Sequence, residues 1–380
     1  MKKIFAAILF IVSVSFVIQA TAQDSTKRWS EEKAWDWYHK QPWLCGFNYI
    51  PAYAINYTAM WDKTSFDPVA IDKELALAQT TGMNVLRAVL QYAVYADDPD
   101  YFLKTLDKFM AICDKHHIKF VPALFDDCVF GINSDPKIGK QPEPLKGWYA
   151  WAWSPSPGHS IVADTTTYPK LTAYVKAVIT RFKNDKRILF WDLYNEPTNG
   201  GMGSMTLPLL KKVVAAAREV NPAQPLSVDV WNGDKRLNKI VFAASDIISF
   251  HNYGNKEQLE NEIQELKKHN RPLINTEWMN RTNGSTIATN LAVFYNEKVG
   301  CMLWGLVNGK TQTNFSWGHR PGDPIPKVWQ HDLFHGDFTP YDSKEIETLK
   351  KYTSEANGNA SVKNKDHSYS FRRQTNFGRK

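Results

Sequence analysis

Cysteine is scarce in this chain, with four residues in 380, and no two of them are separated by only two residues. The scarcity and the spacing exclude a Cys-x-x-Cys zinc site or redox motif. Cys45 and Cys301 lie on the expected first and last strands, which would be neighbours in a closed barrel. We expect two buried free thiols there, with a disulfide between them as the alternative.

Sequence motifs for cofactors and metals are also missing. No glycine-rich phosphate turn follows the first expected strand, and residues 200–203 (Gly-Gly-Met-Gly) lack the lysine of a P-loop. There is no clustered set of carboxylate ligands and no Gly-x-Ser-x-Gly motif. We therefore expect a function that needs no cofactor and no metal.

Long apolar runs are confined to the N-terminus. Lys2 and Lys3 precede an apolar stretch over residues 4–18, and Ala20-Thr21-Ala22 has the small-x-small pattern of a cleavage site. This pattern predicts a secretory signal peptide over residues 1–22 and a secreted or periplasmic mature protein. The alternative, a membrane anchor, is disfavoured because the run is short for a spanning helix. No stable membrane insertion is expected after cleavage.

The net charge of +7 is an end effect. The two N-terminal lysines carry +2 and residues 361–380 carry +5, so the rest of the chain is neutral. This distribution argues against a nucleic-acid partner. The basic segment 358–380 is polar and poor in aliphatic residues, so we expect a disordered tail.

Strand and helix patterns alternate through residues 23–357, which we expect to form one domain. Apolar, β-rich segments occur at 44–49, 84–90, 119–124, 188–193, 226–230, 246–250, 272–276 and 301–307. Amphipathic patterns with helix caps separate them, as at Asp67-Pro68 and Gly82. Eight such units predict a (β/α)₈ TIM barrel rather than an open doubly wound sheet. The segments after strands are long and aromatic at 125–164 and 308–341, so we expect the functional site on that face.

Two of these apolar runs end in a glutamate. Glu196 follows the fourth strand after Asn195, and Pro197 cannot continue the ladder; Glu277 follows the seventh strand. Strands four and seven lie nearly opposite each other in an eight-stranded barrel, so the two side chains can converge. Glycoside hydrolysis uses such a carboxyl pair, one to protonate the leaving oxygen and one as nucleophile or base.

On these residues the chain resembles the retaining glycoside hydrolases of clan A, in particular the cellulase-like glycoside hydrolase family five. The resemblance covers nearly the whole expected barrel and implies that Glu196 is the acid/base and Glu277 the nucleophile. It further implies that Arg87 pairs with Glu277 and holds it ionised, and that Asn195 bonds the sugar 2-hydroxyl. His251 and Tyr253 share a side of their strand, and the family sets that tyrosine against the nucleophile.

Other residues are assigned to substrate binding. Trp304 resembles the tryptophan that forms the floor beneath the sugar at the cleavage point. Many family members carry a histidine near the end of strand three, where this chain has Asp126 and Asp127. The contact to the outer sugar hydroxyls would then be made by an aspartate or not at all, which puts the usual glucan specificity in doubt. Further aromatic and polar candidates near strand ends are Trp148, Trp151, Trp153, Trp231, Trp278, Asn308, Lys310 and Trp317.

The sequence therefore predicts a secreted, monomeric, retaining β-glycoside hydrolase. Xylan, mannan and glucan remain open as substrates. An exo-acting enzyme is an alternative to an endo-glycanase, because the long third and eighth loops could close one end of the cleft. The alternative from another class is a non-catalytic carbohydrate-binding barrel.

Overall fold

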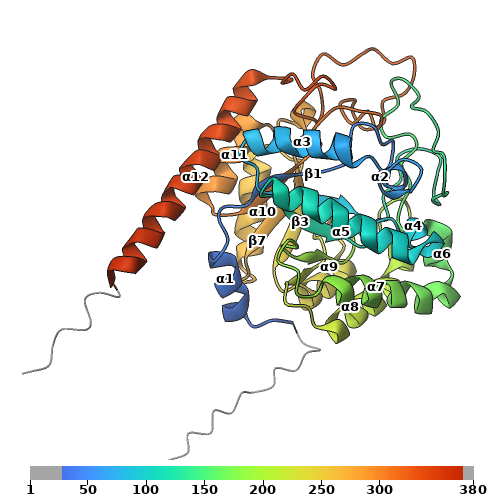
Figure 1. Ribbon diagram of the computed structural model, residues 1–380, viewed down its shortest axis with the longest axis horizontal. Coiled ribbons are helices and arrows are strands. Elements are labelled where there is room, and N and C mark those ends of the chain that lie inside the picture. The colour runs from blue at the N-terminus through green and yellow to red at the C-terminus, as the bar shows by residue number, and fades with distance from the viewer. Residues whose placement is uncertain (1–27, 371–380) are drawn as a thin grey trace, which may run out of the picture.

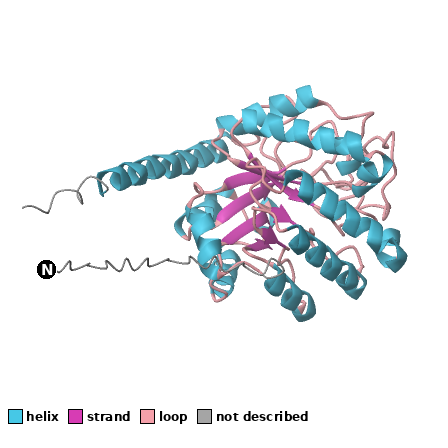
Figure 2. Ribbon diagram, turned by 60° about the horizontal axis from the view of Figure 1, so that its bottom comes forward, coloured by secondary structure: helices cyan, strands magenta, loops and turns pink. Residues whose placement is uncertain are grey.

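A computed structural model describes residues 28–370 of the chain, with the side chains of residues 28–356 (Figure 1). Eight parallel strands run through its centre and helices surround them (Figure 2). The strands are β1 (Cys45–Asn48), β2 (Val85–Val89), β3 (Lys119–Ala123), β4 (Trp191–Asp192), β5 (Leu226–Ser227), β6 (Ile248–His251), β7 (Leu273–Trp278) and β8 (Gly300–Trp304).

The strands form a (β/α)₈ barrel, as expected. Their order is β5-β4-β3-β2-β1-β8-β7-β6, and a parallel bridge between Val230 and Phe250 joins the two ends of this order. Cys45 and Cys301 are register partners on β1 and β8, and both are free buried thiols. The expectation that these strands are neighbours is therefore confirmed.

Helices form at the expected amphipathic segments and at three further short segments, 57–61, 92–97 and 159–163. They are α1 (Glu31–His39), α2 (Tyr57–Trp61), α3 (Pro68–Thr80), α4 (Tyr92–Asp97), α5 (Pro99–Lys115), α6 (His159–Ala163), α7 (Tyr168–Phe182), α8 (Leu207–Val220), α9 (Lys235–Ala244), α10 (Lys256–Lys267), α11 (Ile287–Asn296) and α12 (Ser343–Ser370). Asp67 caps α3 by accepting hydrogen bonds from the backbone N–H groups of residues 69 and 70, with Pro68 in the first turn. Asp234 caps α9 in the same way.

The ends of several strands differ from the prediction. β4 and β5 are each two residues long, against expected segments of five or six. Backbone hydrogen bonds from Leu193 to Ser227 and from Asn195 to Phe125 nevertheless continue the pairing beyond β4. β7 extends to Trp278, two residues further than expected, because register shifts let the strand continue past Asn275.

The barrel interior has two layers. The first, which we call the apolar layer, is one contact cluster that lies against Ala34 of α1, and its members are Leu44, Val85, Val121, Leu189, Phe190, Ile247, Ile274 and Met302. Two residues further along several of these strands lies the second, the polar layer, formed by Arg87, Asp192, Ser249 and Thr276. Period two in a strand makes these residues share the inward side.

α12 continues to Ser370 and extends away from the barrel (Figure 1). It therefore runs into the segment expected to be a disordered tail, while residues 371–380 and the expected signal peptide lie outside the described residues. The domain limits inferred from the sequence stay a prediction. Within residues 28–370, none of the helices combines the length and apolar character that crossing a bilayer requires.

Candidate active site

Glu196 and Glu277 meet at the C-terminal end of the barrel. Glu196 follows β4 with a backbone φ of +38°, an uncommon conformation for a residue with a side chain. Glu277 lies within β7, opposite His251 of β6. One carboxylate oxygen of each glutamate and a ring nitrogen of His251 lie within 4.8 Å of one another. This closeness agrees with the close carboxyl pair of retaining glycosidases, in which about 5–5.5 Å separates the two groups.

Arg87 connects Glu277 to the polar layer. Its Nη1 donates to Glu277 Oε1 at 2.9 Å, so the expected pairing is present. Its Nη2 also donates to Asn195 Oδ1 at 2.6 Å, to Asp192 Oδ2 at 2.5 Å and to Asp229 Oδ2 at 2.8 Å. Arg87 is 1% exposed, so three buried carboxylates surround one buried guanidinium.

His251 and Tyr253 approach Glu277 from β6 and the residues after it. The Tyr253 hydroxyl donates to Glu277 Oε2 at 2.8 Å. His251 Nδ1 lies 2.7 Å from Glu196 Oε1 and 3.5 Å from Glu277 Oε2. On its other side, His251 Nε2 lies 3.3 Å from Asp229 Oδ2. The imidazole therefore stands between the two glutamates, with a third carboxylate behind it.

The pKa directions differ from those that the resemblance implies. Burial raises the pKa of Glu277 to about 7, although His251 and Arg87 act to lower it. Arg87 favours the ionised form of Glu277, as expected from the pairing, but desolvation opposes it. Burial also favours neutral Glu196, but hydrogen bonds from His251 and its other donors outweigh it and lower the pKa.

His251 lies between these two carboxylates and is the group whose surroundings favour the protonated form. Burial alone would lower its pKa, but the charges of Glu277 and Asp229 and the hydrogen bonds to Asp229 and Glu196 raise it well above the usual range. An imidazolium has no free lone pair on Nδ1. Although Glu196, His251 and Glu277 are spaced closely enough to hold a metal ion, the protonated ring disfavours one.

Asp192 and Asp229 share the charge of Arg87 unequally. Burial and the neighbouring charge of Asp229 raise the pKa of Asp192 to about 8. Arg87 and His251 outweigh burial at Asp229 and lower its pKa. Of the two, Asp229 is therefore the one more readily ionised. This division reduces the negative charge beneath Glu277.

A cavity of 380 Å³ lies above the two glutamates. This volume lies within the range typical of small-molecule sites. Seven aromatic side chains contribute to its lining: Phe130, Tyr149, Trp153, Trp231, Tyr253, Trp304 and Trp317. Its polar lining residues are Asn195, Glu196, Asn199, His251, Tyr253 and Glu277, together with Cys128. Flat apolar rings around a carboxyl pair suit a sugar ring, whose faces are apolar and whose edge carries hydroxyls.

Asp126 and Asp127 do not reach this cavity. Both are fully buried, and protein groups satisfy their oxygens. Asp126 accepts from the Asn195 amide at 2.7 Å and the Trp153 indole at 3.0 Å. Asp127 accepts from the Tyr194 hydroxyl at 2.7 Å and the backbone of Thr198 at 2.8 Å. The expectation that they contact sugar hydroxyls is therefore wrong; they fix the loops that carry Glu196 and Trp153.

Trp278 and Asn308 also lie away from the cavity lining. Trp278 is fully buried and packs on Phe294 of α11, because β7 turns this side chain toward the helices. The Asn308 amide donates to Asn314 at 2.6 Å and to Asp332 at 3.2 Å, which holds the loop after β8. Neither position supports the expected contact with substrate.

Hydrogen bonds join the loops after β1, β3 and β8 into one wall beside the cavity, which we call the bonded wall. The backbone and side-chain bonds that join them are Ala150 N to Thr311 O (2.9 Å), Gly147 N to Gln312 Oε1 (3.0 Å), Gln312 Nε2 to Leu145 O (2.8 Å), Lys310 N to Ala52 O (2.9 Å) and Asn56 Nδ2 to Ala152 O (2.9 Å). Tyr149, Trp153 and Trp304 lie on the cavity side of this wall.

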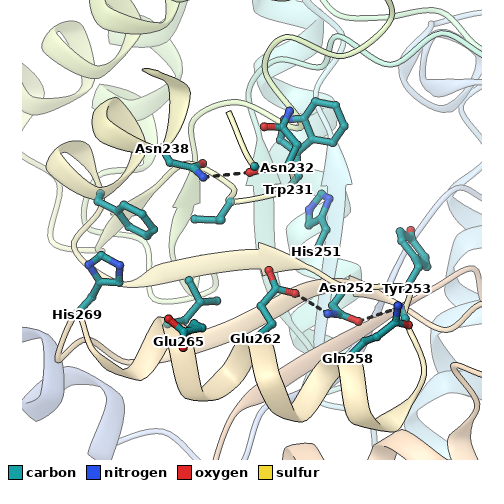
Figure 3. A pocket seen from close by; sticks show the side chains of 15 residues that line it. Trp231, Asn232, Asn238, His251, Asn252, Tyr253, Gln258, Glu262, Glu265 and His269 are labelled. Carbon is teal, nitrogen blue, oxygen red and sulfur yellow. Dashed lines mark hydrogen bonds between the residues drawn. The ribbon is translucent and has the colours of Figure 1, made fainter. Parts of the chain in front are cut away.

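On the opposite side, a second cavity of 560 Å³ lies between α9 and α10 (Figure 3). Trp231, His251 and Tyr253 line both cavities and so separate them. The Trp231 indole donates to the Pro197 carbonyl at 2.9 Å, which ties it to the loop after β4. The catalytic cavity is therefore bounded by a bonded wall on one side and by a thin partition on the other.

Several site residues were missed in the sequence. Asp192 and Asp229 are buried aspartates in strand segments, and the need to neutralise Arg87 was the signal that could have found them. Cys128 and Asn199 both hydrogen-bond Glu196 Oε2, the thiol at 3.2 Å. Nothing in their local sequence indicates this, because they come from loops whose course depends on tertiary packing.

One protein-family model matches most of the barrel. The profile of Cellulase (glycosyl hydrolase family 5) matches residues 51–310, more than half of the chain. No curated protein matches the chain by sequence.

Solved structures with this fold include mannan-degrading enzymes. An exo-β-1,4-mannosidase from Opitutaceae bacterium strain TAV5 is 15% identical with a TM-score of 0.58; the match covers 83% of this chain but 60% of that one. An endo-1,4-β-mannanase from Rhizomucor miehei is 13% identical with a TM-score of 0.54, covering 84% and 96%. A GH5_18 structure from Streptomyces cattleya in complex with GlcNAc is 11% identical with a TM-score of 0.57, covering 83% and 81%. At these identities the likeness shows the fold.

Proposed function

This chain belongs to the Cellulase family, glycosyl hydrolase family 5, and is a glycoside hydrolase; we propose that it removes β-linked mannosyl units by a retaining, two-step mechanism. The observation that carries the mechanism is the close carboxyl pair of Glu196 and Glu277. Of these two glutamates, only Glu277 accepts hydrogen bonds from Arg87 and Tyr253. These two donors leave Glu277 oriented for attack on the anomeric carbon. A carbohydrate-binding barrel without activity would have no need of this asymmetric arrangement.

In the first step, Glu277 attacks the anomeric carbon while the glycosidic oxygen takes a proton from Glu196. The C–O bond to the leaving group breaks, and a glycosyl ester forms on Glu277. In the second step, Glu196 removes a proton from water, the water attacks the anomeric carbon, and the free Glu277 carboxylate is restored. Trp304 forms the floor of the cavity beneath the reacting sugar, and Asn195 is positioned to bond its 2-hydroxyl.

The proton for the leaving group is stored on His251. Its Nδ1 lies 2.7 Å from Glu196 Oε1, so the proton can pass to that carboxyl with little movement. The negative charge of Glu277 helps to hold the proton on His251 in the free enzyme. As Glu277 becomes a neutral ester, this attraction disappears and the His251 proton becomes more acidic. Attack by Glu277 and proton donation through Glu196 are thereby coupled.

The bonded wall of the loops after β1, β3 and β8 supports exo action. A polymer that runs across the cleft needs both ends open, whereas a pocket closed on one side accepts a chain end. The mannosidase and mannanase structures with this fold support mannose as the sugar. Localisation follows from the expected signal peptide: we propose export with cleavage after residue 22, which N-terminal sequencing of the mature protein tests.

A panel of aryl β-glycosides together with defined manno-oligosaccharides tests the proposal. We expect the fastest turnover with aryl β-mannoside and release of mannose from oligosaccharides as the first product. Preference for aryl β-glucoside or β-xyloside would reject the sugar assignment. Early formation of mixed shorter oligosaccharides would reject exo action but leave the retaining mechanism in place. No turnover of any glycoside would favour the binding barrel.

A further inference from the structure

Cys128 is the cysteine whose side chain faces the catalytic cavity. It follows β3 and is 4% exposed, and it lines the 380 Å³ cavity, whereas Cys45, Cys113 and Cys301 are buried elsewhere in the barrel. Its backbone N–H donates to Asp126 Oδ1 at 2.9 Å, which fixes the start of the loop. The sulfur therefore has a defined position beside Glu196.

The Cys128 sulfur lies at the centre of a small hydrogen-bond network. Its S–H donates to Glu196 Oε2 at 3.2 Å. The amide groups of Asn195 and Asn199 donate to the same sulfur at 3.4 and 3.3 Å, and the Asn199 amide also bonds Glu196 Oε2. A thiol is a weak donor and a weak acceptor, and here it serves as both.

We propose that Cys128 is a positioning residue for Glu196, and that its thiol, together with Asn199, sets the pH range over which Glu196 carries the catalytic proton. The inference rests on the proposed acid/base role of Glu196. One oxygen of Glu196 faces the Cys128–Asn199 pair and the other faces His251, so the carboxyl cannot rotate without breaking one of these contacts.

The thiol keeps its proton near neutral pH and so remains a donor. Burial raises the pKa of Cys128 well above its usual value, and the charges of Asp126, Glu196 and Glu277 act in the same direction. A hydrogen bond donated to a carboxylate stabilises the charged form. Removal of the thiol should therefore raise the pKa of Glu196.

Other charged or titratable groups face Glu196 and would contribute to the same pH profile. They are His251 of β6 with Asp229 behind it, Glu277 of β7, Tyr253 after β6, and Arg87 of β2 through Asn195. None of them is changed by substitution of Cys128. A comparison of two variants at this position therefore isolates the effect of the sulfur.

The test compares Cys128→Ala and Cys128→Ser in the full chain, with aryl β-mannoside as substrate and with Cys113→Ala as a control for loss of a buried thiol. The basic limb of the kcat/KM profile reports loss of the proton that Glu196 and His251 share in the free enzyme. For Cys128→Ala we expect this limb to move up by about half to one pH unit, because one hydrogen bond to the charged form of Glu196 is lost. The serine hydroxyl restores a donor, so Cys128→Ser should return toward the wild-type profile. Equal profiles for wild type and both variants, or equal shifts in both variants, would overturn the proposal.

A second measurement uses the wild-type thiol and does not depend on a variant that folds. Methyl methanethiosulfonate adds a methylthio group to a cysteine and releases methanesulfinate. Only the thiolate reacts, and burial disfavours it, so we expect slow modification of Cys128 that becomes faster as the pH rises. Peptide mass spectrometry should locate the label on Cys128, turnover should fall with labelling, a competitive inhibitor should protect, and Cys128→Ser should not be inactivated. Modified Cys128 with full activity would refute the inference. If the wild-type enzyme turns over no glycoside, the proposed function itself has failed.

Discussion

The two layers of the barrel interior use the same strands for opposite purposes. Val85 and Ile274 belong to the apolar layer, and two residues further along their strands come Arg87 and Thr276 of the polar layer. The first layer is an ordinary hydrophobic core against α1. The second holds the Arg87 guanidinium, which pairs with the carboxylates of Asp192 and Asp229 and with Glu277 above them. A step of two residues along a strand therefore leads from the apolar layer, which stabilises the barrel, to the polar layer, which orients the reactive groups.

The largest effect is expected above the polar layer, at the two glutamates. Glu277→Ala should abolish turnover, because no other group can attack the anomeric carbon. Glu196→Ala should lower kcat by about 10²–10⁴-fold for substrates with poor leaving groups. Azide should partly restore Glu196→Ala with an activated aryl mannoside, since a small anion can attack the glycosyl ester without a general base. Steady-state kinetics checks both variants, and full activity in either would reject the assignment.

A change within the polar layer should impair both stability and activity. Arg87→Met leaves the carboxylates of Asp192, Asp229 and Glu277 without their buried partner. Breaking such a network from one side costs about 3–5 kcal/mol. Chemical denaturation should show this loss, and addition of Asp192→Asn should recover part of it by removing one carboxylate. An unchanged unfolding midpoint for Arg87→Met would contradict the view that this network is tightly balanced.

A change within the apolar layer should affect stability alone. Met302→Ala removes a fully buried side chain two residues before Trp304. Truncation of this kind costs about 2–5 kcal/mol of unfolding free energy. The folded fraction should keep kcat close to the wild-type value, because the glutamates and their hydrogen-bond partners are untouched. A large fall in kcat at temperatures where the variant is folded would mean that the layers are not separable.

The smallest expected effect is a shift of the acidic limb of the kcat/KM profile along the pH axis. Glu277 must be ionised to attack, and its pKa is about 7, so kcat/KM should fall as pH drops below about 7. The Tyr253 hydroxyl lowers this pKa by donating to Oε2. Tyr253→Phe should therefore move the acidic limb to higher pH. If the acidic limb of Tyr253→Phe stays in place or moves to lower pH, Tyr253 does not stabilise the charged form of Glu277.

Much of the apolar layer and the positions of both glutamates could be predicted from the sequence. The strand pattern included Arg87 in the second expected strand, and the family resemblance paired it with Glu277. The sequence did not identify Asp192 and Asp229 as further partners of Arg87, since they come from separate strands. It also assigned Asp126 and Asp127 to the substrate. Their burial depends on long loops, and local sequence carries little information about how such loops pack.

The pKa order of the site could not be predicted either, because it depends on the position of His251. The family resemblance assigned the proton to Glu196 and the charge to Glu277. In the structure, His251 lies between them and reverses the directions in the free enzyme. The pKa values of these three residues depend on one another because their side chains, from three different strands or loops, lie within a few ångströms of one another.

Trapping of the glycosyl ester tests the central claim most directly. A 2-deoxy-2-fluoro-β-mannosyl fluoride should react and then hydrolyse slowly, since the fluorine at C2 destabilises the charged transition state of both steps while fluoride leaves readily. Peptide mass spectrometry should find one mannosyl label per chain, and the account predicts that Glu277 carries it. A label on Glu196, or turnover with inverted product and no label, would contradict the account.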